Sequence, residues 1–487
     1  MKRRHALSFL ASAPWGARAQ QPAAPSAASL AAAAELAGDV ELMRDILGSL
    51  HPGLLRYNSP LQLDAAMAPF KRAFTTAPDL EQRFLALSRF LALLKCGQSR
   101  ANVFNQAPAA AAELFDRKTR LPLTMRWIGD QMIVTASSVL RERLPPGTWI
   151  GAVNGVPSAR MLATLLPAIP ADGSNDARRR SLLGLRGQTP LETFDVLQGL
   201  VYGEPPGGVF RLDVRTPDGA IGSVEVPALT MAERHAQLAA TPADGVRWDW
   251  RIDEPGVAVL TMPTWALQDS AWDWRAWLRE RLDELATDTA AKALIVDLRG
   301  NEGGLDCGHP VLERFLSADS VLPMRRLVRF QTTPEHLNRH LDSRDESLRR
   351  LGAKARRFDS RFFALPDSDA PLRPQGARLL LPLWVLVDAA NSAATFSFAQ
   401  RVRASGAGKL VGETTGGNLR GHNGGAFFFV RLPASGLEFD LPLIGSFPLQ
   451  PAPDAALAPD VKVEVTAADI AAGRDRVLER ALALARA

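Results

Sequence analysis

The chain has 487 residues, of which 46% are hydrophobic and 22% charged, a composition typical of globular proteins. This length exceeds one compact core and indicates about three domains. The formal net charge of +5 is small, and its densest cluster, Arg178-Arg179-Arg180, lacks interleaved aromatic residues, so we interpret it as a solvated loop and expect no nucleic-acid partner. No run of about 18 apolar residues occurs, so we expect no membrane span.

The N-terminus carries the features of an export signal. Lys2-Arg3-Arg4 is positively charged, residues 6–13 are mostly apolar, and Ala17-Arg18-Ala19 fits a cleavage site. We therefore predict a signal peptide over residues 1–19, an Ala/Pro-rich spacer over 20–34, and an exported bacterial protein that is periplasmic or secreted.

Residues 35–105 have the periodicity of helices. Apolar side chains recur at i, i+4 and i, i+3 spacing, as at Leu42, Ile46 and Leu50. Prolines punctuate the region. We expect a small N-terminal helical domain here.

Residues 120–232 change to short strands and turns. Met125 to Val134 predicts a hairpin around Gly129-Asp130, and Gly147 to Val156 a second one around Asn154-Gly155. Further strands are expected over Val209 to Val214 and Gly222 to Val226. The pattern Gly-x-x-Ile-x-x-Val-Asn-Gly resembles the central strands of a PDZ-like module, which binds peptide ends by strand addition.

Strands and helices alternate over residues 245–487, which predicts an α/β domain with a largely parallel sheet. Expected strands cover 257–261, 294–297, 380–387 and 410–411, and expected helices 272–285, 311–316 and 394–405. Residues 318–376 interrupt this rhythm, and we expect an irregular insertion that caps a site.

Two places in this domain carry candidate chemistry. The apolar strand Leu294-Ile295-Val296 leads into a loop whose glycines, Gly303 and Gly304, free the backbone to hold an anion or oxyanion. Ser392 follows a second apolar strand and opens a helix, where the next N–H lies at the positive end of the helix dipole.

Five segments together resemble the tail-specific, or C-terminal processing, serine protease family, including its tricorn-core-like branch. They are Asp297 to Gly304, Ser392-Ala393, Gly412 to Gly417, Leu432 to Gly436 and Pro459-Asp460-Val461. The resemblance implies a multi-domain α/β fold, with an N-terminal helical segment, a PDZ-like β module and a crotonase-like α/β protease core.

The resemblance also implies a mechanism. Ser392 would attack a peptide carbonyl, and the N–H groups of Gly303 and Ala393 would hold the oxyanion. The substrate would be a polypeptide whose C-terminus the PDZ-like module presents, and no cofactor or metal is expected.

The expected proton acceptor is missing from its usual places. Where one branch of the family has lysine this chain has Gly417, and where the tricorn-like branch has histidine it has Gln98, which cannot accept a proton near neutral pH. The histidines that could compensate are His422, in what reads as a flexible glycine-rich loop, His309 and His51.

Two further residue pairs invite interpretation. His336 and His340 stand at i, i+4 spacing, but Leu337 replaces the glutamate of a zinc helix, so a solvated helix face is favoured. From the family fold, we hypothesise that Cys96 and Cys307 approach one cleft and form a disulfide, with two separately buried thiols as the alternative.

Two other functions stay open at the level of sequence. Because of Gln98, the protein could be an inactive relative that binds peptide or a hydrophobic ligand. A crotonase-type acyl-CoA enzyme would share the core layer and the oxyanion loop, but the PDZ-like pattern argues against it. Substrate identity and oligomeric state cannot be read from the sequence.

Overall fold

Helices form the first part of the chain. The computed structural model describes residues 27–137, 140–187, 189, 191–238, 248–253, 256–366 and 371–487, so the predicted signal peptide lies outside the described residues. The helices are α1 (Ala27–Leu50), α2 (Pro60–Thr75), α3 (Leu80–Leu93) and α4 (Pro108–Phe115). The predicted helical region is confirmed. The spacer was predicted too long, because the alanine-rich run from Ala27 is already helical, as the high helix propensity of alanine favours.

A small β module follows, with antiparallel strands in the order β1-β2-β3-β5-β6 and β4 paired to β3. Both predicted hairpins are confirmed, and Asn154 (φ +49°) and Gly155 (φ +75°) have the positive φ angles of a tight two-residue turn. The strands are β1 (Leu123–Ile128), β2 (Gln131–Ser137), β3 (Trp149–Val153), β4 (Val156–Pro157), β5 (Val209–Arg215) and β6 (Ile221–Pro227). The helical elements are α5 (Ser158–Leu165), η1 (Leu166–Ala168), α6 (Asp176–Leu182), α7 (Thr193–Tyr202), η2 (Pro206–Gly208) and α8 (Met231–Leu238).

The second sheet is the largely parallel one that the sequence predicts. Its order is β18-β15-β14-β9-β8-β7, and of these pairs only β7 with β8 is antiparallel. Apolar side chains pack on both of its faces, which is why its strands read as continuously apolar. The strands are β7 (Asp249–Asp253), β8 (Val257–Thr261), β9 (Ala293–Asp297), β14 (Leu383–Val387), β15 (Lys409–Gly412) and β18 (Val461–Lys462). Its helices are α9 (Trp274–Thr287), α10 (His309–Phe315), α11 (Ala393–Ser405), α12 (Ala467–Ala471) and α13 (Arg476–Arg486).

The third sheet corrects the expected role of residues 318–376. This segment was expected to cap the site, but its short strands extend a sheet in the order β11-β16-β17-β10-β13-β12. It also packs on α1, where Arg329 donates to the carbonyl of Gly48 and His336 Nε2 lies 2.9 Å from Asp45 Oδ2. The elements are β10 (Met324–Val328), η3 (Glu335–His340), β11 (Leu341–Asp342), η4 (Glu346–Arg350), β12 (Arg356–Arg357), β13 (Phe363–Ala364), β16 (His422–Arg431) and β17 (Glu438–Pro448).

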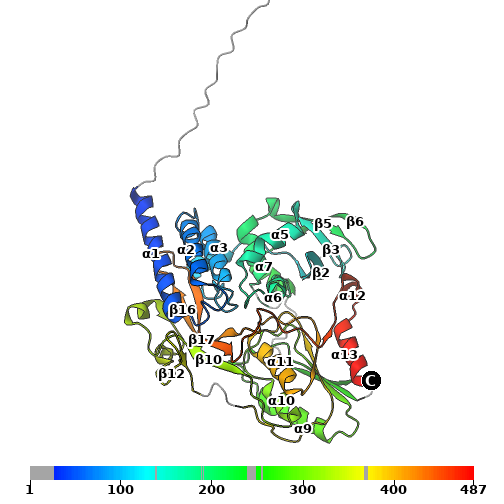
Figure 1. Ribbon diagram of the computed structural model, residues 1–487. Helices are drawn as coiled ribbons and strands as arrows, with labels where there is room; N and C mark the ends of the chain where they lie inside the picture. The colour runs from blue at the N-terminus through cyan, green and yellow to red at the C-terminus, as the bar shows by residue number, and fades with distance from the viewer. Residues whose placement is uncertain are drawn as a thin grey trace, which may run out of the picture.

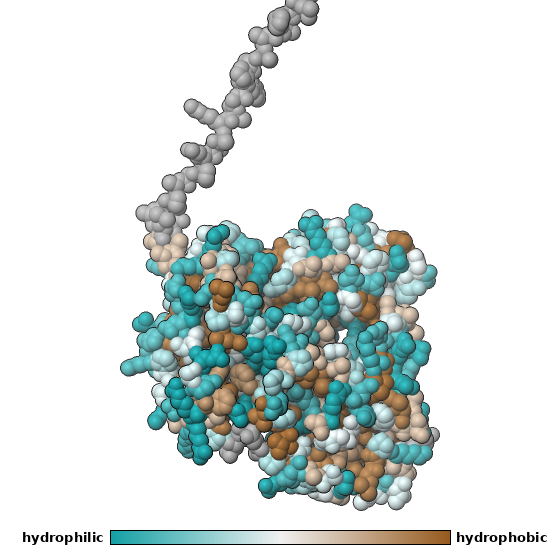
Figure 2. Space-filling view, in the orientation of Figure 1, coloured by the Kyte–Doolittle hydropathy of each residue, from teal (hydrophilic) through white to brown (hydrophobic). Residues whose placement is uncertain are grey.

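The parts meet around one region. Figure 1 shows the N-terminal helices and the small β module side by side above the α/β core, with α6 on the side of the module that faces the core. On the face shown in Figure 2, apolar residues form scattered patches among hydrophilic ones. No helix in the described part of the chain is long and apolar enough to cross a membrane. The predicted class, a multi-sheet α/β protein with N-terminal helices, is confirmed.

Candidate active site

Ser392 lies where β14 gives way to α11. The turn between them is held by Asn391, whose Oδ1 accepts the N–H of Asp388 and whose Nδ2 donates to the carbonyls of Leu298 and Asn301 in the loop after β9. Ser392 is the N-cap residue of α11 and is 5% exposed, yet its hydroxyl caps no helix N–H. Ser392 therefore follows the carboxyl end of the buried strand β14, and Asn391 ties this turn to the loop after the neighbouring strand β9.

Ala393 has a strained backbone. Its φ is +47°, in the left-handed region that a residue with a Cβ enters at a cost of about 1–2 kcal/mol. Of the described non-glycine residues, only Lys95 and Asn154 share a positive φ. Strain of this kind persists only where the surrounding structure enforces it, and it gathers at functional sites. It marks the Ser392-Ala393 junction as a special position.

The glycine-rich loop packs directly against this junction. A Cβ on Gly303 (φ +102°) would lie 2.9 Å from the Ser392 carbonyl oxygen and 3.0 Å from the Ala394 nitrogen, so a side chain is excluded there. The Gly303 N–H donates to Asn301 Oδ1 at 3.0 Å, and the Ser392 hydroxyl donates to the Glu302 carbonyl at 3.0 Å. In this conformation both groups are satisfied inside the loop, so oxyanion binding by Gly303 requires its N–H to leave Asn301.

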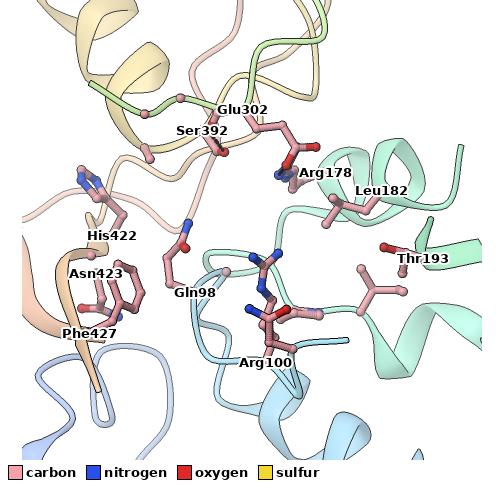
Figure 3. A pocket seen from close by; sticks show the side chains of 18 of the residues that line it. Gln98, Arg100, Arg178, Leu182, Thr193, Glu302, Ser392, His422, Asn423 and Phe427 are labelled. Atoms are coloured by element: carbon pink, nitrogen blue, oxygen red, sulfur yellow. Dashed lines mark hydrogen bonds and ion pairs between the residues drawn. The ribbon is translucent and has the colours of Figure 1, made fainter. Parts of the chain in front are cut away.

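A cavity of about 800 Å³ opens in front of Ser392. Its walls come from the N-terminal helices, the small β module, the core loops and the third sheet. Figure 3 shows Gln98, His422 and Ser392 around the same space. The cavity brings together most of the residues singled out from the sequence, namely Gln98, Gly303, Gly304, Ser392, Ala393 and His422.

The backbone around Gln98 is held in place by contacts of the residues on either side of it. The carboxylate of Asp172 accepts the N–H of Gly97, Asn423 Nδ2 donates to the sulfur of Cys96, and His51 Nε2 lies 2.9 Å from Ser99 Oγ. These contacts come from the small β module, the third sheet and the N-terminal helices. The position of residue 98 is therefore fixed by the whole assembly of parts.

His422 is the first residue of β16, where it pairs with Ser446, so the prediction of a flexible loop was wrong. Burial, followed by the nearby Arg56 charge, lowers the pKa of His422 to about 4. Its Nδ1 is buried and has no hydrogen-bond partner among the described residues. The ring is therefore neutral at pH 7.

The other sequence candidates lie outside the cavity. His309 begins α10, His51 is buried against Ser99, and neither lines the space in front of Ser392. Gly417 is closed to any side chain, because a Cβ there would lie 2.3 Å from the Phe396 ring. A lysine at position 417 does not fit this packing.

The two cysteines are not bonded. Cys96 and Cys307 are both free and buried, which contradicts the hypothesised disulfide and agrees with the alternative of two separate thiols. Cys307 packs in the apolar layer on one face of the parallel sheet, whereas Cys96 contacts Asn423. Burial raises the pKa of both thiols.

Sequence reasoning missed Arg178. The cluster Arg178-Arg179-Arg180 was expected in a solvated loop, but it lies on α6, and Arg178 is 8% exposed. Its guanidinium contacts both Glu302 carboxylate oxygens, at 3.3 and 3.0 Å, and donates to the Ala390 carbonyl at 3.0 Å. Burial alone would raise the pKa of Glu302, but Arg178 holds it below its usual range. Arg178 thus joins the small β module to both loops that surround Ser392.

Replacing Arg178 with glutamine is expected to slow the reaction of Ser392 with an acylating reagent by about 10- to 100-fold, because a reacting group displaced by about 1 Å loses that much rate. Arg178→Lys should recover only part of the rate, since lysine keeps the charge but not the two-pronged contact. Arg179→Gln is the matched control, because the partners of the Arg179 side chain among the described residues, Asp176, Ile169 and Gly173, all belong to the small β module. Equal rates for Arg178→Gln and Arg179→Gln, with both proteins folded, would contradict this role.

The buried histidines make stability depend on pH. Burial, followed by the Arg56 charge, lowers the pKa of His51 to about 3, and its Nδ1 accepts the Gly53 N–H. His51 and His422 are neutral in the folded protein but protonate in the unfolded chain below about pH 6.5. Their stabilisation is complete above that pH and is lost as the pH falls toward 4, at about 1.4 kcal/mol per pH unit for each group.

We therefore expect the thermal midpoint to fall between pH 6.5 and 5.0, and to fall less steeply in His51→Gln. Exposed His235, which forms no ion pair with the described residues, offers the control His235→Gln, which should keep the wild-type slope. A wild-type slope in His51→Gln as well would show that this imidazole does not contribute.

Comparison with known proteins adds two findings. Residues 256–423 match the model of peptidase family S41. No curated protein sequence matches the chain.

In the described part of the chain, no group of three or more potential metal-binding side chains occurs.

Several solved structures are similar to this chain, and those of CPAF have the same fold. Mature CPAF complexed with lactacystin aligns with a TM-score of 0.62 and 16% identity, covering 93% of this chain and 98% of that chain. Another structure of mature CPAF aligns with a TM-score of 0.59 and 16% identity, covering 91% of this chain and 94% of that chain. The photosystem II D1 C-terminal processing protease aligns with a TM-score of 0.42 and 13% identity, covering 88% of this chain and 93% of that chain. At these identities the CPAF structures show the fold alone, and what the family model adds is that residues 256–423 are similar to peptidase family S41.

Proposed function

We propose that this protein is a serine peptidase that cleaves polypeptides with Ser392 as the nucleophile. The observation that carries the proposal is the strained Ser392-Ala393 junction, which faces a cavity of about 800 Å³ and packs against Gly303. A buried serine that caps no helix N–H, followed by a left-handed alanine, has no evident structural purpose at the start of α11. Nucleophilic attack gives this costly geometry a reason.

The roles of the neighbouring groups follow from this proposal. The N–H groups of Ala393 and Gly303 would bind the oxyanion once Gly303 leaves Asn301. His422 is the proposed proton acceptor, since it lines the same cavity and is neutral at pH 7. A base with a pKa near 4 is weak, so we expect slow turnover.

The small β module is the proposed docking site for the substrate C-terminus. One outer strand, β1, already exchanges two backbone hydrogen bonds with Leu185 at Met125. The other outer strand of the described sheet is β6. Strand addition by a peptide would therefore use the β6 edge.

A second function is supported by a specific observation. Ser392 donates to the Glu302 carbonyl, Gly303 donates to Asn301, and Gln98 occupies the position where the family resemblance expects histidine. These three features suit a relative that binds a peptide or hydrophobic ligand without cleaving it.

Digestion of an unfolded polypeptide separates the two functions. The peptidase predicts new peptide termini that accumulate with time and are identified by mass spectrometry. An intact polypeptide that nonetheless binds the protein would support the binding function instead.

A further inference from the structure

A second cavity, of about 920 Å³, lies between the small β module and the core. It shares no lining residue with the cavity in front of Ser392. One wall is a face of α6 formed by Ala177, Arg180 and Ser181, at i, i+3 and i+4 spacing. The opposite wall is formed by core loops, including Arg299-Gly300 and Asp388-Ala389, and the strands β1 and β2 complete it.

Four arginines and three carboxylates line this cavity, and most of these charges are already satisfied. Arg126 pairs with Glu413 at 2.8 Å, and Arg299 pairs with Asp297 and Asp475, each at 2.6 Å. The remaining two carboxylates are also engaged: Asp388 accepts the N–H groups of Gly300 and Ala390, and Glu464 pairs with Lys462.

The other two guanidinium groups form no ion pair with the described residues. Among the described residues, the acceptors of the Arg186 guanidinium are neutral: the Gly300 carbonyl at 3.3 Å and Ser181 Oγ at 2.9 Å. Arg180, the residue before Ser181, has a buried Nε with no hydrogen-bond partner among the described residues, and no ion pair within them. A buried N–H without an acceptor is costly, and a ligand in this cavity would supply an acceptor to Arg180 and a counter-charge to both guanidinium groups.

We propose that this cavity binds a multi-oxygen anion, a carboxylate or a phosphate group, between Arg180 and Arg186. Guanidinium groups bind such anions through paired, charge-assisted hydrogen bonds, whereas a ligand with one acceptor oxygen could satisfy only part of this geometry. Because Arg186 also donates to Gly300, the bound anion lies next to the loop that carries Gly303.

Binding is tested without any measurement of peptidase activity, so its failure and the failure of the proposed function are distinguishable. Inorganic phosphate is titrated by calorimetry at constant ionic strength, and a short peptide with a free C-terminal carboxylate is compared with its amide. We expect saturable binding of phosphate, of the free-acid peptide, or of both, and the two arms identify the source of the oxygens. Peptide binding at the β6 edge would not depend on Arg180, so only binding that Arg180→Gln weakens supports this cavity. No saturable binding in either arm would overturn the proposal.

The variant Arg180→Gln breaks no side-chain hydrogen bond or ion pair in the described part of the chain, so it should fold normally and weaken binding at least tenfold. Exposed Arg160→Gln, in the same module, is the matched control and should bind like the wild type. Unchanged affinity in Arg180→Gln, or an equal loss in Arg160→Gln, would overturn the assignment to this cavity.

Discussion

Replacing Ser392 with alanine is expected to abolish peptide hydrolysis, with a loss of at least about 10³-fold that reaches the uncatalysed rate. The reason is that the hydroxyl is the only group in the proposal that forms a covalent bond to the substrate carbonyl. Substrate affinity should change little, because the cavity walls and the small β module are untouched. Turnover and binding are measured separately, by release of a fluorescent peptide product and by calorimetry.

Ser397 offers the matched control. It lies on α11 and lines the same cavity, but the proposal gives it no chemical role. Ser397→Ala should therefore retain turnover within about twofold of the wild type. If Ser392→Ala cleaves peptides at the wild-type rate, another group is the nucleophile and the proposed mechanism is wrong.

Replacing Gln98 with histidine is expected to raise turnover by about 10²-fold or more, since a positioned general base contributes about 10²–10⁴-fold. The backbone around residue 98 is fixed by Asp172, His51 and Asn423, so a new imidazole would enter the same cavity. An imidazole near its ordinary pKa of about 6.5 suits this role better than His422, whose pKa is lowered to about 4.

The pH profile distinguishes the two bases. Protonation inactivates a base, so the Gln98→His rate should fall as the pH drops through about 6.5. If His422 is the base in the wild type, as proposed, that rate should stay level down to about pH 5. Gln98→Asn is the control, because a shorter amide cannot accept a proton. A folded Gln98→His protein that is no faster than Gln98→Asn would show that a missing base does not limit the reaction.

Local sequence signals predicted the elements that position the site. Continuously apolar strands before Asp297 and Asp388 indicated a sheet buried on both faces, and both are central parallel strands in the structure. The Asn154-Gly155 turn predicted its hairpin because few residues tolerate two consecutive positive φ angles. The cavity contains Ser392 and Gly303, which were chosen from their places after two neighbouring strands.

Features that depend on distant contacts were not predicted. Arg178 reads as a surface charge until Glu302, 124 residues away, supplies its partner. The glycines after His422 suggested a loop, but they accompany an irregularity in the pairing of β16 with β17, between Gly424 and Phe427. The positive φ of Ala393 leaves no signal in the sequence, because alanine is ordinarily helical.

An activated nucleophile at Ser392 should react with a fluorophosphonate, and the site of reaction can be identified directly. The protein is incubated with the reagent at pH 8 until labelling is complete, digested, and analysed by tandem mass spectrometry. The account predicts a single adduct on Ser392 in the wild type and faster formation of the same adduct in Gln98→His. An adduct on another residue, or no adduct in either protein while a reference serine peptidase is fully labelled, would contradict it.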